Sequence, residues 1–242
     1  VMLLLSRMAS SKSYSSSQDL KITAQPTHMA NPHPRMFSNG SKRIFNMKVK
    51  LVSYSKPVLE GLETPTDLVA FCARVSNPSN QMNSDTAEKL IKYLINNQHW
   101  SPLEMASMCL EIETTRDIAR QILRHRSFSF QEFSQRYAVA DLGHELKEAR
   151  LQDTKNRQNS VELNLTNDDD RRLAYQWENI QKGVVNSTTQ AYEWAIANGI
   201  AKEQARAVLP EGITTSRMYM NGTLRSWVHY IQLRSANGTQ KE

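Results

Sequence analysis

The sequence predicts an α+β fold: a single domain with a mostly antiparallel sheet packed by helices, preceded by a disordered N-terminal tail. Three observations support this prediction. Met108, Leu110 and Ile112 alternate with small or acidic residues, as in a half-buried strand. Several other segments repeat apolar residues at helical spacing. Residues 1–46 show neither period.

The tail, residues 1–46, differs in composition from the rest of the 242-residue chain. It contains nine serines and six basic residues against one acid, whereas the other 196 residues hold 24 bases and 23 acids. Such a segment cannot bury enough apolar surface to offset its ordering entropy, so we expect it to be disordered, or to be non-native sequence upstream of a start at Met47. An Arg/Ser-rich start also resembles an organelle transit peptide, but we expect a cytoplasmic protein.

The first elements of the domain, residues 47–242, are a strand and two helices. Residues 47–54 alternate in part and indicate an edge strand. Thr66 is expected to cap a helix. The apolar face of this helix is expected to consist of Leu68, Phe71 and Val75. Residues 84–97 predict a second helix.

The half-buried strand and another helix come next. Thr115 is expected to cap a helix that runs to about Leu123. Residues 141–167 are polar and irregular, which predicts a long surface excursion. A long helix then begins at Asp168 and stops near Asn198. Its apolar stripe is expected to be Trp177, Ile180, Val184, Thr188, Ala191 and Ala195.

Four short elements complete the chain. We expect a short helix that leads to Pro210, a strand at residues 213–220, a turn at residues 221–222 and a last helix at residues 224–234. On that helix Arg225 and Arg234 are nine residues apart, which is half a turn at about 100° per residue. The two arginines therefore point in opposite directions. A simple surface helix can have this arrangement, and a helix that serves two ligands at a subunit interface requires it.

Composition excludes several classes of protein. Hydrophobic residues make up 39% and charged residues 22%, which suits a globular protein with a core. Cys72 and Cys109 make no disulfide framework, and we expect no metal site. No apolar run approaches the roughly 18 residues of a membrane span. The net charge of +6 lies almost entirely in residues 1–46, so the body does not have the charge typical of nucleic-acid-binding proteins.

The most informative segment, residues 124–137, reads R-H-R-S-F-S-F-Q-E-F-S-Q-R-Y. Arginine forks match phosphate oxygens, and neighbouring hydroxyls complete the hydrogen bonding. The segment therefore suits an anionic ligand with several phosphates. A solvated basic loop is the alternative, but such a loop has no need of three phenylalanines.

This segment resembles the signature of the flavin-dependent thymidylate synthases, R-H-R-x-x-S-x-N-x-x-S-x-R. The matching positions are Arg124, His125, Arg126, Ser129, Ser134 and Arg136. At about 5% usage per residue type, chance gives such agreement in on the order of one window in ten million or fewer. Gln131 departs from the pattern, which has Asn there.

The resemblance covers about residues 50–242. Further blocks that look like the family are residues 73–76, 99–104, 205–210 and the last helix. Because the family usually continues past the position of Glu242, we expect a C-terminal truncation.

The resemblance implies an activity. Such enzymes methylate dUMP to dTMP, with methylenetetrahydrofolate as carbon donor and FAD, reduced by NADPH, as hydride carrier. They are homotetramers whose active sites are shared between protomers. The expected partners therefore include neither nucleic acid nor membrane.

The resemblance also implies site residues, each identified by matching one position of the family to one residue of this sequence. The expected cofactor-binding residues are Ser101, Arg124, His125, Arg126, Glu132, Thr223, Arg225 and His229. The expected substrate-binding residues are Gln121, Arg124, Glu132, Ser134, Gln135, Arg136, Arg206 and Arg234. Arg234 is the expected catalytic residue, a cation beside the uracil ring. Taken alone, a histidine such as His125 is more often structural than catalytic, and Arg206 is consistent with a cation at a helix end.

Two other functions remain open from the residues alone. One is folate- and flavin-dependent uracil methylation of RNA, and the other is a non-enzymatic nucleic-acid-binding module. The near-neutral body argues against both, and no G-x-G-x-x-G opens a βαβ unit.

Overall fold

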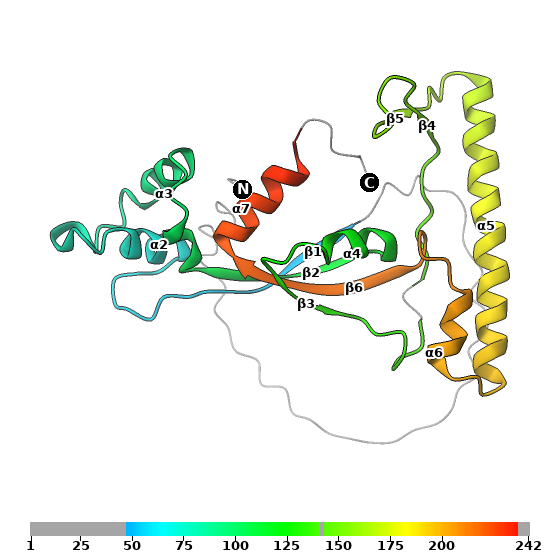
Figure 1. The fold of residues 1–242 in the computed structure, drawn as a ribbon, viewed down its shortest axis with the longest axis horizontal. Helices are drawn as coiled ribbons and strands as arrows, with labels where there is room; N and C mark the ends of the chain where they lie inside the picture. Colours follow the sequence, from blue (N-terminus) through cyan, green and yellow to red (C-terminus); the bar gives the residue numbers. More distant parts are fainter. Residues whose placement is uncertain (1–46, 141–142, 237–242) are drawn as a thin grey trace, which may run out of the picture.

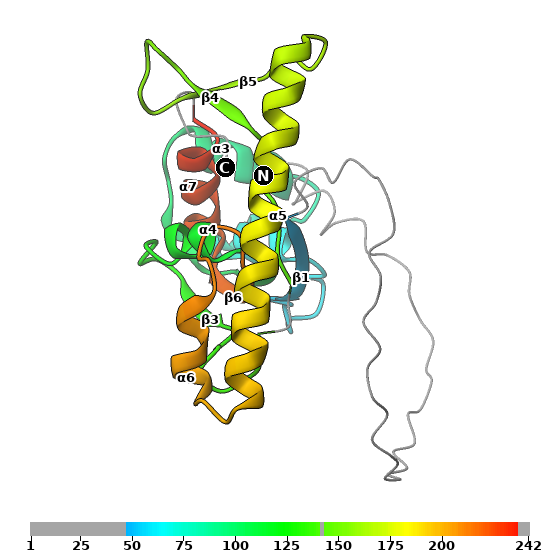
Figure 2. The same ribbon diagram turned by 90° about the vertical axis from the view of Figure 1, so that its right-hand side faces the viewer.

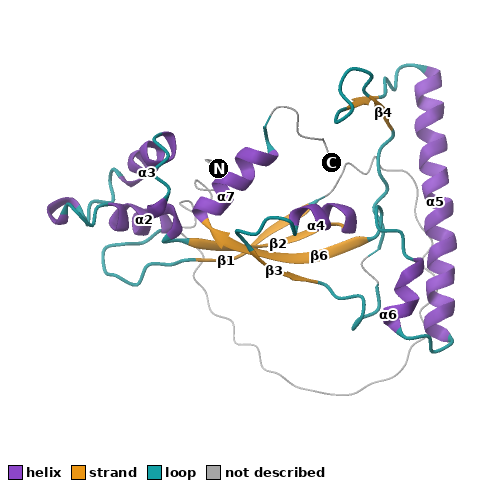
Figure 3. Cartoon of the chain, in the orientation of Figure 1, coloured by secondary structure: helices purple, strands orange, loops and turns teal. Residues whose placement is uncertain are grey.

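The computed structural model describes residues 47–140 and 143–236, so the expected tail lies outside the described residues. A four-stranded sheet in the order β1-β2-β6-β3 forms its centre, and every neighbouring pair is antiparallel (Figure 3). Its strands are β1 (Lys48–Tyr54), β2 (Ser107–Thr115), β6 (Thr215–Thr223) and β3 (Ser129–Glu132). A two-stranded sheet joins β4 (Arg150–Gln152) and β5 (Ser160–Glu162). The predicted fold class is confirmed.

The helices surround the sheet (Figure 1). They are α2 (Pro65–Ala73), η1 (Pro78–Asn80), α3 (Ala87–Asn96), η2 (Ser101–Glu104), α4 (Arg116–Ile122), α5 (Asp168–Ala197), α6 (Lys202–Ala205), η3 (Arg206–Val208) and α7 (Leu224–Arg234). Helices α4 and α7 cover one face of the sheet, α2 and α3 lie at one end, and α5 and α6 lie at the other (Figures 1 and 2). Within the described residues, no helix combines the length and apolar character needed to cross a membrane.

The core lies between the sheet and helices α4 and α7. Strand β2 alternates as predicted, and Met108, Leu110 and Ile112 point into the core. In the antiparallel register Leu110 faces Met220 on β6, so the two central strands bury the same face. The indole Nε1 of Trp227 on α7 donates a hydrogen bond to the Met108 carbonyl oxygen (3.2 Å), which fixes α7 on this face.

The edge strand and the last helix were predicted correctly, but three local expectations were wrong. Thr64 caps α2, not Thr66, because Thr64 and Asp67 form a reciprocal capping box. The buried residues of α2 are Pro65, Val69 and Ala70, so its buried face is not the expected one. Val75 lies beyond the end of α2 and is 68% exposed. The expected turn at residues 221–222 lies inside β6, because β6 continues to pair with β2 up to Thr223.

The long helix α5 begins and ends where expected, but its expected apolar stripe is largely exposed. Of the six stripe residues only Ala195 is buried, together with Gln181 and Tyr192. The reason is that α5 packs on the polar excursion of residues 143–167, which contains β4 and β5. Gln181 exchanges hydrogen bonds with the backbone N–H and carbonyl of Lys147 (both 2.8 Å), so a polar side chain occupies the buried face.

Candidate active site

The signature segment forms a tight turn between α4 and β3. The amide N of His125 donates to the Ile122 carbonyl oxygen (3.1 Å), and the amide N of Phe128 donates to that of His125 (3.3 Å). Strand β3 follows at Ser129 and pairs with β6. The turn leaves Arg124 and Arg126 exposed to solvent.

Phe128 anchors this turn. Its ring is buried, and its centroid lies 4.8 Å from that of Trp227 and 5.8 Å from that of Tyr230 on α7. Gly222 of β6 makes room for the ring, because a Cβ at that position would lie 2.4 Å from Phe128 Cδ1. The buried ring of Phe128 thus argues against the purely solvated loop considered above.

Arg234, at the end of α7, meets the end of α4. Its Nε donates to His125 Nε2 (3.2 Å), and its Nη2 donates to the Gln121 carbonyl oxygen (3.3 Å). The His125 ring also packs edge-on against Tyr230, with centroids 4.7 Å apart. Three predicted site residues, separated by up to 113 positions, therefore form one group.

The environment of His125 favours a neutral imidazole. Burial lowers the pKa of His125, and the nearby positive charge of Arg234 lowers it further. A neutral ring that accepts at Nε2 carries its proton on Nδ1. His125 therefore acts as a hydrogen-bond acceptor that orients the Arg234 guanidinium.

A second group lies at the start of α7, next to η2. Arg225 forms an ion pair with Glu104, and the His229 ring packs edge-on against Trp100 with centroids 4.4 Å apart. Thr223 caps α7, because its Oγ1 accepts from the amide N of Ser226 (3.3 Å). The expected cofactor residue Ser101 is exposed at the first position of η2 in the same region.

A third group surrounds the end of β3. The Ser216 hydroxyl donates to Glu132 Oε1 (2.8 Å), and Arg116 Nη1 lies 3.7 Å from the same oxygen. Beyond Glu132, Ser134 is half-buried and Arg136 is exposed, with its guanidinium 5.3 Å from the centroid of the Tyr137 ring.

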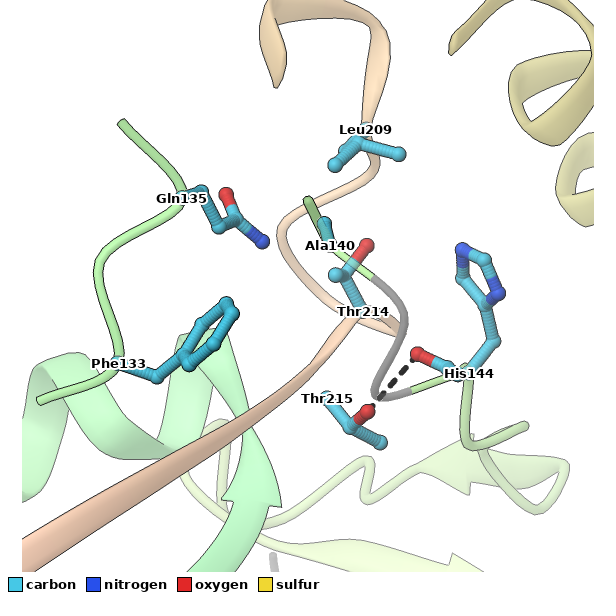
Figure 4. Close-up of a pocket in the computed structure, with 8 residues that line it drawn as sticks. Phe133, Gln135, Ala140, His144, Leu209, Thr214 and Thr215 are labelled. Atoms are coloured by element: carbon cyan, nitrogen blue, oxygen red, sulfur yellow. Dashed lines mark hydrogen bonds between the residues drawn. The ribbon is translucent and has the colours of Figure 1, made fainter. Parts of the chain in front are cut away.

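Gln135 and Arg206 lie in the region of the third group. Gln135 is buried and lines a small pocket with Phe133, Leu209 and Thr214 (Figure 4). Arg206 opens η3, and its Nε donates to the Glu203 carbonyl oxygen (3.3 Å), which is the helix-end contact considered above.

The structure therefore divides the expected site into three groups. Arg225, His229, Thr223 and Ser101 gather at η2, and Arg234, His125 and Gln121 gather at the end of α4. Of the remaining substrate residues, Arg124 lies in the turn before β3, and the others lie at the end of β3, just beyond it, or at η3. Helix α6, which precedes η3, lies at the opposite end of the sheet from α7 (Figures 1 and 2).

The cations of the signature segment are available to an anion. Within the described residues, Arg124, Arg126 and Arg136 make no ion pair. An anionic ligand with a diphosphate fits such exposed guanidinium groups. No group of three metal-ligating side chains occurs in the described part of the chain. Burial raises the pKa of the Cys109 thiol, which does not favour a thiolate nucleophile.

Sequence reasoning missed the partners of these residues. Glu104 lies in the family-like block of residues 99–104, so its position was noted but its role was not. Arg116, Ser216 and Glu211 gave no signal: Arg116 and Glu211 are 95 positions apart, and Ser216 and Glu132 are 84 positions apart.

Comparison with known proteins identifies the family. A family model described as "Thymidylate synthase complementing protein" matches residues 51–242. The chain belongs to this family. That membership confirms the resemblance to the flavin-dependent thymidylate synthases drawn from residues 124–137.

Relatives of this thymidylate synthase family support the assignment. A probable flavin-dependent thymidylate synthase of Paramecium bursaria Chlorella virus 1 is 50% identical over 196 residues, covering 81% of this chain and 88% of the relative. A flavin-dependent thymidylate synthase of Synechocystis is 50% identical over 200 residues, with the same coverage. A solved UMP/dUMP methylase, PolB from Streptomyces cacaoi bound with 5-Br UMP, superposes with a TM-score of 0.60 at 25% identity, covering 77% of this chain and 76% of PolB.

Proposed function

We propose that this chain converts dUMP to dTMP, with methylenetetrahydrofolate as carbon donor and FAD, reduced by NADPH, as hydride carrier. The observation that carries the proposal is the contact of Arg234 with His125 and Gln121, which joins the last helix to the family signature. When bound, FAD supplies the hydride that completes the methyl group. Every other step depends on how the chain holds and polarises its ligands.

Arg234 is the proposed catalytic residue. Uracil C5 is a poor nucleophile until negative charge builds on the ring nitrogen and carbonyl oxygens. A fixed cation at that edge stabilises the charge as it develops, most strongly in a site closed to water. Arginine stays protonated and its planar fork can meet two ring atoms, while the neutral His125 fixes its orientation without neutralising it.

The other predicted residues hold the ligands. We assign Ser101, Arg126, Thr223, Arg225 and His229 to FAD. We assign Gln121, Glu132, Ser134, Gln135, Arg136 and Arg206 to dUMP, and Arg124 to both. The guanidinium groups of Arg124 and Arg126, which form no ion pair with any described residue, support the assignment, because diphosphate and phosphate oxygens bind arginine forks in pairs. The resemblance also implied FAD contacts for His125 and Glu132. We assign His125 instead to the orientation of Arg234, which it contacts, and Glu132 to dUMP alone, because Ser134 and Arg136 directly follow it beyond the end of β3.

We further propose a homotetramer with active sites shared between protomers. The separation of the site into groups supports this, since Arg206 opens η3 directly after α6, and α6 lies at the end of the sheet away from α7 (Figure 1). The exposed apolar face of α5 also supports it, because Tyr175, Ile180 and Trp194 are each at least 60% exposed. Analytical ultracentrifugation tests this proposal: a tetramer is expected, and a monomer that retains full activity would exclude it.

The purified protein provides the decisive test of the activity. It should be yellow and should release tritium from C5-labelled dUMP when NADPH and methylenetetrahydrofolate are present. UMP serves as the comparison substrate, because PolB, the solved neighbour, is a UMP/dUMP methylase. A colourless protein that releases no tritium from either nucleotide would refute the proposal.

A further inference from the structure

A buried arginine lies behind the predicted nucleotide residue Glu132. Arg116 is the first residue of α4 and is only 6% exposed. Its Nε donates to Glu211 Oε2 (3.0 Å), and its Nη1 lies 3.7 Å from Glu132 Oε1. A buried charge is costly unless it is paired, so this arginine requires both carboxylates.

Glu211 fixes the far side of Arg116. Its other oxygen, Oε1, accepts from Arg120 Nε (2.9 Å), so both oxygens are held. Burial raises the pKa of the Glu211 carboxyl, but the hydrogen bonds from Arg120 and Arg116 outweigh it and leave the pKa below its ordinary value. The backbone adds a further restraint, because the amide N of Arg116 donates to the Thr214 carbonyl oxygen (3.0 Å). The Arg116 guanidinium is therefore held in one place.

The contacts on Glu132 are asymmetric. Arg116 and the Ser216 hydroxyl both approach Oε1, the latter at 2.8 Å. Within the described residues, Oε2 has no polar partner. A glutamate has three side-chain torsions, and ordering a free one on binding costs affinity. A carboxylate held by one oxygen avoids that cost and presents the other oxygen to a ligand.

We propose that Arg116 is a positioning residue that, together with Ser216, holds the Glu132 carboxylate so that its second oxygen accepts a hydrogen bond from the bound nucleotide. This inference rests on the proposed function, which places dUMP at Glu132. Arg116 acts only through Glu132 and touches no ligand itself. It therefore belongs to nucleotide affinity and not to flavin binding.

Calorimetric titration of the FAD-bound protein with dUMP tests this positioning. In Arg116→Met we expect the Kd for dUMP to rise at least about tenfold, and in Ser216→Ala about three- to tenfold, as typical for one hydrogen bond. The Kd for FAD, measured on the apo-protein, should stay within about twofold. Arg120→Met is the matched control: it removes the other cation on Glu211. Within the described residues Arg120 makes no ion pair or hydrogen bond to Glu132, only a longer-range charge interaction, so the dUMP Kd should change by less than about twofold.

The Glu132→Ala background separates positioning from a general structural role. There, Arg116→Met and Ser216→Ala should change the dUMP Kd by less than about twofold, because the residue they act through is gone. If both variants lower the Tm but leave the dUMP Kd unchanged, or if their effects persist in full in that background, the inference is wrong. Should Arg116→Met fail to fold, Ser216→Ala alone decides. A wild-type protein that does not bind dUMP would refute the proposed function, and this inference with it.

Discussion

The two ends of helix α7 hold their arginines in different ways. At its start, Arg225 pairs with the carboxylate of Glu104, and both side chains are 41% exposed. At its end, Arg234 donates only to uncharged acceptors, His125 Nε2 and the Gln121 carbonyl oxygen. Among the described residues, Arg234 has no carboxylate partner.

This difference bears on what each arginine can do. A half-exposed ion pair contributes little to stability and mainly fixes geometry, so Arg225 ties α7 to η2. The charge of Arg234 is oriented but not neutralised, so it remains available to negative charge that develops during a reaction. One helix thus carries an arginine suited to organising a ligand and another suited to stabilising a transition state.

The largest expected effect is at Arg234. We predict that Arg234→Ala turns over dUMP about 10²–10³ times more slowly, because one electrostatic donor to the developing charge is lost. FAD binding should remain nearly normal. Arg234→Lys should recover only part of the rate, since lysine offers a point charge and no fork. Steady-state kinetics of the two variants measures this, and an alanine variant within about threefold of wild type would mean that Arg234 merely caps the helix.

Arg126, which we assign to FAD, is the arginine to compare with Arg234. Its exposed guanidinium has no ion pair within the described residues, so Arg126→Ala should lose flavin before it loses the fold. A charge-assisted hydrogen bond contributes about 1.5–3 kcal/mol, which corresponds to a rise in Kd of roughly 10- to 150-fold. Titration of apo-protein with FAD checks the affinity, and thermal unfolding should show an unchanged Tm. An unaltered Kd removes Arg126 from the site.

A substitution at Gly222 tests whether the turn between α4 and β3, which Phe128 anchors, depends on close packing. We predict that Gly222→Ala lowers the free energy of unfolding by about 1–3 kcal/mol, because the new Cβ would displace the Phe128 ring. Denaturant unfolding measures the loss. Gly183→Ala, where a Cβ meets nothing within 4 Å, is the matched control and should be neutral or slightly stabilising.

The smallest effect concerns the protonation of His125. Burial and Arg234 lower its pKa in the folded state, so the unfolded chain binds more protons near the ordinary pKa of about 6.5. Stability should therefore fall as the pH drops below about 6.5, and His125→Gln should remove part of that slope. His144, whose pKa burial also lowers, accounts for another part. A slope that is identical in His125→Gln and wild type between about pH 5 and 8 would contradict this.

Local sequence patterns predicted those elements whose partners are apolar and close. The alternation at Met108–Ile112 identified β2, and the spacing after residue 223 identified α7, because a buried face leaves a period in the sequence. The predicted stripe of α5 was wrong, because one part of the buried face of that helix packs on the polar backbone of Lys147. Only its C-terminal part, with Tyr192 and Ala195, packs on apolar residues such as Ala205. The turn expected at residues 221–222 failed because Gly222 serves close packing against Phe128.

The residues of the candidate site could be predicted from the sequence only through the family signature. Its residues could be named one by one, but the contact of Arg234 with His125 joins positions 109 apart, and no spacing rule reveals it. The same holds for Arg116 and Glu211, 95 positions apart. Long-range pairing is set by the register of the sheet and the packing of helices, which local patterns do not encode.

The claim that the ends of α7 serve different ligands has one direct test. The affinities for FAD and for dUMP should be measured by titration for both Arg225→Ala and Arg234→Ala. We predict that Arg225→Ala weakens FAD about tenfold or more and leaves dUMP within about twofold, while Arg234→Ala weakens dUMP and leaves FAD within about twofold. If both substitutions weaken the same ligand to the same extent, the two ends act as one site and the account is wrong.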